Sequence, residues 1–321
     1  MTSRRFGNKQ LLRLTVIVGL GTLASAAGRS GPQAGFDCAA GPRLCYDPPV
    51  NAGPLINTRS FEGGPFLSQD GLTLLFGAAR RNSLGQLDED IYIATRETTS
   101  QPFGAPENLG PTVNSLGFGD YSPELSNDGL TLYFASSRPG GFGESDLYVT
   151  TRESTEDPWG PPQNLGPNVN SASFDGQPSL SANGKTLYWD SFRPDGFGDF
   201  DIWMATRDGT SETFGPAVNV GPEVNTRGPE FGPAISQNDR QLFFSSGRLG
   251  NIGQIDIWVV ERSKNKTDVS RWGTPINVET LNSLFFQAMP TFSASGQHVC
   301  FMAFRPEGFG GLDIWCAERS Q

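Results

Sequence analysis

Residues 120–148 read DYSPELSNDGLTLYFASSRPGGFGESDLY, and residues 175–203 read DGQPSLSANGKTLYWDSFRPDGFGDFDIW. Both stretches hold the same parts in the same order: an acid three residues before a proline, a turn after a serine, an alternating strand, an arginine, a glycine-rich loop and a further strand. The turns Asn-Asp-Gly and Ala-Asn-Gly tolerate positive φ and are typical of β-hairpins. A repeated unit of hairpins is therefore the main signal in this chain.

The last strand of this unit recurs five times at a spacing of 55 to 57 residues, starting at Asp90, Asp146, Asp201, Asp256 and Asp313. The strand before it ends each time near an arginine, namely Arg80, Arg138, Arg193, Arg248 and Arg305. An aromatic-glycine pair such as Trp159-Gly160 then opens a fourth strand. Four short strands in a unit of about 55 residues predict a β-propeller blade rather than a helical solenoid.

The two ends of the chain predict how the ring closes. The fifth unit stops at Gln321 before any fourth strand, and residues 46–57 match residues 159–170, which contain that strand in the second unit. A propeller must pair its first and last blades to hide their edges. We therefore expect an all-β, five-bladed β-propeller with four antiparallel strands per blade, closed by an N-terminal strand that completes blade five. The expected repeats cover about 54–110, 111–166, 167–221, 222–278, and 279–321 plus 46–53.

Composition limits the function classes. The net charge is −10, which argues against nucleic acid and favours neutral or cationic partners. His298 is the only histidine, so histidine metal sites and a Ser-His-Asp triad are improbable. We expect no cofactor and a monomer.

The first residues are typical of a secretory signal. Four basic residues precede the apolar run 14–23, and the small residues 24–27 follow it. We expect a signal peptide at 1–27, a flexible leader at 28–44 and one propeller domain at 45–321, in a periplasmic or secreted protein without a membrane span after cleavage. The alternative is an uncleaved anchor, although the run is shorter than the ~20 residues that a spanning helix needs. Export by the general or the twin-arginine route stays open.

All four cysteines lie in the part expected to be exported, where disulfides form. Cys300 and Cys316 lie at similar distances from Gly308 in one hairpin, which favours a bond between them and leaves Cys38 to pair with Cys45. The competing arrangement joins Cys45 to Cys316 and fastens the closing strand. Both would stabilise the fold, and no Cys-x-x-Cys motif suggests redox catalysis.

The repeat resembles the TolB-type, WD-like β-propeller repeat of exported bacterial proteins over roughly residues 46–321. The resemblance is carried by the Pro-x-x-Ser-x-Asp-Gly turn, the arginine after it and the Asp-Ile-Trp strand. It implies a propeller that binds other proteins or envelope components. We expect no counterpart here to the separate N-terminal domain of TolB itself, and therefore no TolB-like role.

One column of the repeat places an acid or amide three residues before each inner-strand proline, which we expect to open that strand: Glu62, Asp120, Asp175, Glu230 and Gln287. In a propeller these side chains would surround one end of the central channel. They could bind a cationic peptide or a cation, with oxygen ligands that suit Ca²⁺. The alternative is that each one caps local backbone N–H groups.

Two further columns have structural and functional interpretations. Each arginine named above lies across one hairpin loop from the aspartate that follows it, so we expect an Arg–carboxylate bridge inside each blade. The loops between them carry apolar tips at Phe142, Phe197, Ile252 and Phe309. These tips either form a partner-binding rim or pack against the neighbouring blade.

Three functions follow from these observations. The first is a non-catalytic binding module for an envelope or secreted protein. The second is carbohydrate binding or glycoside hydrolysis by channel carboxylates, against which equivalent repeat positions argue, because a catalytic pair needs two different pKa values. All six tryptophans also fall in strand columns, which leaves no obvious sugar platform. The third is a purely structural role.

Overall fold

The structure of the chain is a computed structural model that describes residues 44–82, 85, 87–209, 213–262 and 272–320. Contacts divide the chain into Met1–Cys45 and Tyr46–Gln321, and the second unit is described below. The expected signal peptide, the expected leader up to residue 43, and Cys38 lie outside the described residues.

The described residues of Tyr46–Gln321 form twenty strands in five antiparallel four-stranded sheets, without a helix. Blade one contains β2 (Glu62–Leu67), β3 (Thr73–Arg81), β4 (Leu87–Thr95) and β5 (Glu107–Asn108). Blade two contains β6 (Asp120–Leu125), β7 (Thr131–Ser136), β8 (Asp146–Thr151) and β9 (Gln163–Asn164). Blade three contains β10 (Asp175–Leu180), β11 (Thr186–Ser191), β12 (Asp201–Thr206) and β13 (Val218–Asn219). Blade four contains β14 (Glu230–Ile235), β15 (Gln241–Ser246), β16 (Asp256–Glu261) and β17 (Ile276–Asn277). Blade five contains β18 (Phe286–Phe292), β19 (His298–Phe304), β20 (Asp313–Glu318) and β1 (Val50–Asn51).

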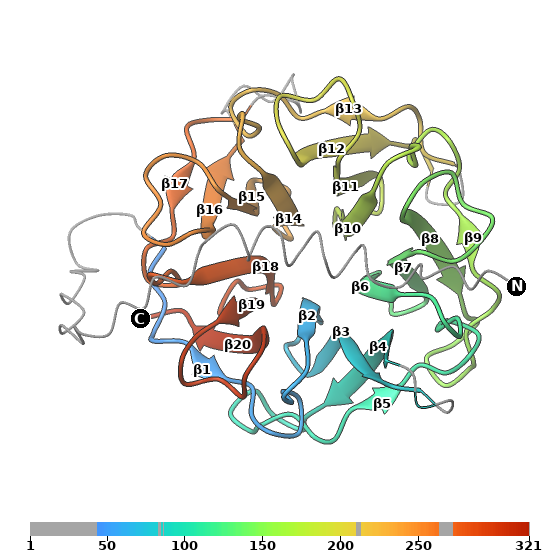
Figure 1. The fold of residues 1–321 in the computed structure, drawn as a ribbon, viewed down its shortest axis with the longest axis horizontal. Helices are drawn as coiled ribbons and strands as arrows, with labels where there is room; N and C mark the ends of the chain where they lie inside the picture. The colour runs from blue at the N-terminus through green and yellow to red at the C-terminus, as the bar shows by residue number, and fades with distance from the viewer. Residues whose placement is uncertain (1–43, 83–84, 86, 210–212, 263–271, 321) are drawn as a thin grey trace, which may run out of the picture. The chain divides into compact units, whose positions relative to one another are not determined.

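The five sheets form a ring with the first strand of each blade innermost (Figure 1). Each first strand contacts the first strands of both neighbouring blades. The ring closes where β1 pairs with β20, with Val50 opposite Cys316 and Asn51 opposite Trp315. The prediction of a five-bladed propeller completed by an N-terminal strand is therefore confirmed.

The hydrophobic core lies between the blades. Separate apolar clusters join blades one and two, two and three, three and four, and five and one. Their largest members come from alternating positions of the second strands, such as Phe134 and Trp189. Because successive strand residues point to opposite faces, each sheet offers apolar side chains to both neighbours.

The innermost strands of blades one to four begin at the acid of the repeat, that of blade five begins one residue before Gln287, and the proline lies inside each strand. The expectation that the proline opens the strand was therefore wrong. In β6 the pairing with β7 shifts between Tyr121 and Glu124, and Ser122 adopts a φ of 51°. This bulge accommodates Pro123, which has no N–H to give to the ladder. The same shift occurs in all five innermost strands.

The cysteines of blade five confirm one expected pairing. Cys300 and Cys316 lie opposite each other on β19 and β20 and form a disulfide. The competing bond between Cys45 and Cys316 is therefore excluded. Cys45 is also disulfide-bonded.

Candidate functional site

The column of Glu62, Asp120, Asp175, Glu230 and Gln287 occupies the first or second residue of each innermost strand, and all five side chains are fully buried. Asp120 Oδ2 accepts hydrogen bonds from the backbone N–H and the hydroxyl of Ser115, and Asp175 does the same with Ser171. Glu62 and Glu230 accept the same two hydrogen bonds from the backbone N–H and the hydroxyl of Thr58 and Thr226 respectively. The column presents no exposed carboxylate, so local capping accounts for it better than ligand binding at a channel mouth does.

In blades two to four the arginine column pairs with this inner column, not with the aspartates across the loop. Arg138 lies 2.6 Å from Asp120, Arg193 lies 2.5 Å from Asp175, and Arg248 lies 3.5 Å from Glu230. The predicted bridges to Asp146, Asp201 and Asp256 were therefore wrong. The reason is that those aspartates are already engaged by their own loops, as shown below.

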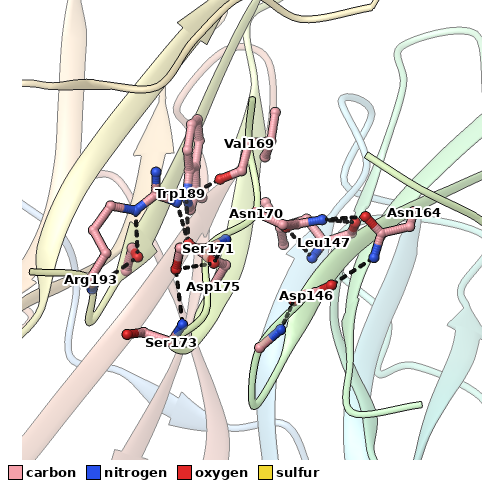
Figure 2. A network of polar contacts seen from close by, with 12 residues as sticks. Asp146, Leu147, Asn164, Val169, Asn170, Ser171, Ser173, Asp175, Trp189 and Arg193 are labelled. Carbon is pink, nitrogen blue, oxygen red and sulfur yellow. Dashed lines mark hydrogen bonds and ion pairs between the residues drawn. The ribbon is translucent and has the colours of Figure 1, made fainter. Parts of the chain in front are cut away.

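Each of these arginines also fastens the loop that enters its blade. Arg193 donates to the carbonyl of Val169 and lies over the ring of Trp189, 5.4 Å from its centroid (Figure 2). It also lies over the ring of Trp203, 4.9 Å from its centroid. Arg80 and Arg305 make the same carbonyl bond, to Ile56 and Leu281. Each guanidinium group therefore stacks on two aromatic rings and donates to a loop carbonyl. In blades two to four it also pairs with a carboxylate.

The third-strand aspartates hold the glycine-rich loops. Asp146 accepts hydrogen bonds from the backbone N–H groups of Phe142 and Gly143, at 2.6 and 3.0 Å, and from the amide of Asn164 on β9 (Figure 2). Asp201, Asp256 and Asp313 likewise accept from the N–H of Phe197, Ile252 and Phe309. In blade one, Asp90 accepts from Asn108. In blades two to five these aspartates therefore connect the loop tip to the outer strand.

Two further repeated sets were missed in the sequence. The first is an asparagine clamp, in which Asn170 exchanges two hydrogen bonds with the backbone of Leu147 and a third with Asn164 (Figure 2). Its equivalents are Asn57, Asn114, Asn225 and Asn282. The second is a set of arginines that stack on the aromatic residue opening the fourth strand and donate to the inner turn: Arg96, Arg152, Arg207 and Arg262. Recurrence at fixed repeat positions was the signal for both sets.

The exposed apolar side chains gather at one end of the blades. Within the described residues, twelve of the large exposed hydrophobic residues lie in, or at the edge of, the loops after the second and fourth strands: Leu55, Leu87, Leu116, Phe118, Phe142, Phe192, Phe197, Leu249, Leu284, Phe285, Phe304 and Phe309. Antiparallel pairing places both kinds of loop at the same end of a sheet. We call this set the apolar loop face.

Hydrogen bonds link neighbouring loops of this face between blades two and three and between blades four and five. Glu144 N–H donates to the carbonyl of Ser173, and Gln254 N–H donates to that of Phe285. A Cβ on Gly143 would lie 2.0 Å from the oxygen of Ser173, so this close backbone approach explains the glycine of the loop. Phe142, Phe197 and Phe309 are 51%, 48% and 42% exposed, whereas Ile252 is partly buried. The phenylalanine tips are therefore about half exposed to solvent.

The carboxyl groups of Glu89 and Glu124, which lie outside the repeated columns, have raised pKa values. Burial, helped by the nearby Asp120, Asp88 and Asp90, raises the pKa of Glu89 to about 8. Burial also raises the pKa of Glu124 to about 8, against the opposing effect of the Leu180 N–H that it accepts. Neither acid belongs to one of the repeated columns described above, so these two raised pKa values are features of single blades.

The described residues hold no group of three or more His, Cys, Asp or Glu side chains placed to bind a metal ion. They also contain no helical segment with the length and hydrophobicity of a membrane span.

Comparison with known proteins gives relatives by fold alone. No family model and no curated protein sequence matches the chain. Among solved structures, TolB from Acinetobacter baumannii superposes with a TM-score of 0.52 at 14% identity, over 83% of this chain and 56% of that one. An α-L-arabinofuranosidase from Lactobacillus brevis gives 0.54 at 16% identity, over 84% and 94%. The catalytic domain of an α-L-arabinofuranosidase from Coprinopsis cinerea gives 0.56 at 9% identity, over 87% and 98%.

The chain is thus a five-bladed β-propeller, and its structural neighbours with a propeller-like fold include both a TolB protein and glycosidases. It spans little more than half of the Acinetobacter baumannii TolB chain.

Proposed function

We propose that this chain is an exported, non-catalytic binding module whose protein partner docks on the apolar loop face. The observation that carries the proposal is the gathering of exposed phenylalanine and leucine side chains on that face. Exposed apolar side chains gathered on one face are typical of protein interaction sites. Loops on a rigid scaffold are also where binding residues concentrate.

The charges beside the phenylalanine tips indicate the chemistry of the partner. Glu144, Asp195, Asp199 and Glu307 are exposed next to Phe142, Phe197 and Phe309. The whole chain is also acidic, with a net charge of −10. An apolar protein surface flanked by lysine or arginine therefore complements this face best.

The repeated polar columns support binding over catalysis by those columns. Their carboxylates are committed to loop N–H groups, arginines and asparagines, as described above. The signal-like residues 1–27 and the Cys300–Cys316 disulfide support export, because disulfides persist in oxidising compartments.

The test compares two folded variants of the mature domain in capture from an envelope and culture-supernatant extract. The first changes Phe142, Phe197 and Phe309 to Ser on the loop face. The matched control changes Asn127, Asp128 and Glu156, exposed on the turns at the opposite end, to Ser. We expect a protein that the native domain and the control retain and the loop-face variant loses. Equal retention by all three would contradict the proposal.

Glycoside hydrolysis is the second candidate, favoured by one observation. Glu89 is a partly buried carboxyl with a pKa of about 8 beside other acids, which suits a general acid at neutral pH. Hydrolysis of aryl α-L-arabinofuranosides or β-xylosides that Glu89→Gln abolishes, in a protein with unchanged unfolding, would replace the binding proposal. The absence of turnover with both substrate classes would leave the binding proposal as stated.

A further inference from the structure

The bulges of the five innermost strands bring one residue from each blade together beside the axis of the ring. These residues precede the strand prolines and all have positive φ: Gly64, Ser122, Gln177, Gly232 and Met289. Neighbouring members touch, since a Cβ on Gly232 would lie 2.9 Å from the Cα of Met289 and 3.2 Å from Gln177 Oε1. The backbones therefore pack closely here, and a side chain at position 232 would collide with Met289 and crowd Gln177.

Asp190 is a buried acid next to this ring of residues. It lies on β11 opposite Gly176 and is 1% exposed. Its equivalent in blade four is Ser245, whose hydroxyl accepts the N–H of Met289 from the next blade at 2.8 Å. The corresponding N–H for Asp190 belongs to Gly232, yet neither carboxylate oxygen receives a hydrogen bond of good geometry. Burial raises the pKa of Asp190 well above its usual value, and the Gly232 backbone opposes this.

Besides the two carboxylate oxygens of Asp190, the side-chain oxygen of Gln177 near Gly232 also lacks a hydrogen-bond donor among the described residues. Its side chain is 8% exposed, and no donor reaches its Oε1 atom within the described residues. Asp190 and Gln177 therefore both lie beside Gly232, and both carboxylate oxygens of Asp190 and the Oε1 atom of Gln177 lack a donor of good geometry in the part of the chain that the structure describes. Leaving buried acceptors unsatisfied costs free energy, and native proteins rarely do so.

The chemistry of this pair indicates what would satisfy it. All three atoms are oxygens and together carry at most one negative charge. The arginines of the two blades concerned, Arg193 and Arg248, are bonded to Asp175, Glu230 and loop carbonyls. Carboxylate and amide oxygens are the ligands that hard cations prefer.

We propose that Asp190 and Gln177 bind one metal cation of the Ca²⁺ type between blades three and four, with water completing its coordination. This site is separate from the apolar loop face, so it can fail while the proposed function stands. Its role is to connect two blades near the axis and so to stabilise the closed ring.

The experiment measures thermal unfolding of chelator-treated protein in metal-free buffer, then with Ca²⁺, Mg²⁺ or Na⁺ added separately. The chain itself supplies suitable variants. Asp190→Ser copies Ser245, which would accept the Gly232 N–H, and Gln177→Met copies Met289, which tolerates the same positive φ. Glu124→Gln is the matched control, because it alters another buried inner-strand carboxyl that already accepts a hydrogen bond.

We expect Ca²⁺ to raise the unfolding midpoint of the native protein with one ion bound per chain by metal analysis. At a concentration 100 times the dissociation constant, the unfolding equilibrium constant should fall about 100-fold. Asp190→Ser should lose this response while folding at least as well without metal, and Gln177→Met should weaken binding at least tenfold. Glu124→Gln should respond as the native protein does.

Three results would overturn the proposal. One is a native midpoint that none of the three cations changes, which would mean that a protonated Asp190 satisfies the pair by itself. Another is an unchanged response in both Asp190→Ser and Gln177→Met. The third is loss of the response in Glu124→Gln, which would place the cation elsewhere.

Discussion

At the scale of residues, small departures from the repeat leave identifiable groups without partners. In blades two to four the arginine Nε bonds a serine hydroxyl, as Arg193 does with Ser191 at 2.9 Å. In blades one and five that serine is replaced by Ala78 and Ala303, and the Nε atoms of Arg80 and Arg305 are buried without a hydrogen bond. Burial also lowers the pKa of Arg305, as expected for a cation short of partners.

Ala303→Ser should therefore stabilise the protein. The new hydroxyl would accept from Arg305 Nε, and the gain should be about 0.5–1.5 kcal/mol in the free energy of unfolding. Urea denaturation measures it. The reverse change in blade three, Ser191→Ala, should lower the free energy of unfolding by about 1–3 kcal/mol, because it orphans Arg193 Nε. A loss of stability in Ala303→Ser would show that the site has no room for the hydroxyl.

Glu124 predicts a dependence of stability on pH. Its pKa is near 4.5 in an unfolded chain and about 8 in the fold, so the folded state binds the extra proton between these values. Stability should therefore fall as pH rises from about 5 to 8, by up to about 1.4 kcal/mol per pH unit for this group. Glu124→Gln keeps an oxygen for the Leu180 N–H and should flatten the profile. Parallel profiles for native and variant would contradict the assigned pKa.

At the scale of elements, the repeat predicts strands well and side-chain partners less well. Hairpin turns such as Asn127-Asp128-Gly129 indicate where strands begin and end, and the mirrored spacing about Gly308 is enough to predict the Cys300–Cys316 bond. The start of each inner strand was missed because proline normally avoids strand interiors, whereas here a bulge admits it. The Arg138–Asp146 bridge was mispredicted because nearness along the chain does not show that Phe142 and Gly143 already occupy the carboxylate.

The cross-strand disulfide between β19 and β20 should stabilise blade five. Cys300 and Cys316 are 16 residues apart, and closing a loop of that length stabilises by roughly 3 kcal/mol through loss of unfolded-chain entropy. Changing both cysteines to Ala should lower the free energy of unfolding by about 2–3 kcal/mol, measured in urea without reductant. An unchanged free energy of unfolding would mean that the β19–β20 pairing alone fixes this blade.

At the scale of the whole ring, closure depends on a strand from the other end of the sequence. Besides the β1–β20 pairing, Asn51 donates to Asp313, and Asp47 N–H donates to the carbonyl of Glu318. The match of residues 46–57 to residues 159–170 was enough to predict this arrangement. The apolar loop face was only partly predictable, because Leu116 and Leu284 share a repeat position that the other blades fill with Arg59, Ala172 and Arg227, so no apolar column marks it in the sequence.

A circular permutant tests closure. Moving residues 44–53 behind residue 321 through a short Gly/Ser linker gives blade five the connectivity of the other blades, so the permutant should unfold as cooperatively as the native chain. Deleting residues 44–53 without replacement should expose the β20 edge and cause association or loss of cooperativity. Size-exclusion chromatography and thermal unfolding measure both. A monomeric, fully cooperative deletion variant would show that the strand is dispensable.

The claim that the repeated polar residues build the ring while the apolar loop face binds the partner is tested most directly by hydrogen–deuterium exchange with and without the captured partner. The account predicts slower exchange on binding in loops 138–145, 193–200 and 305–312. Protection confined to the turns at 68–71, 126–129 and 181–184, or to the outer strands, would contradict it.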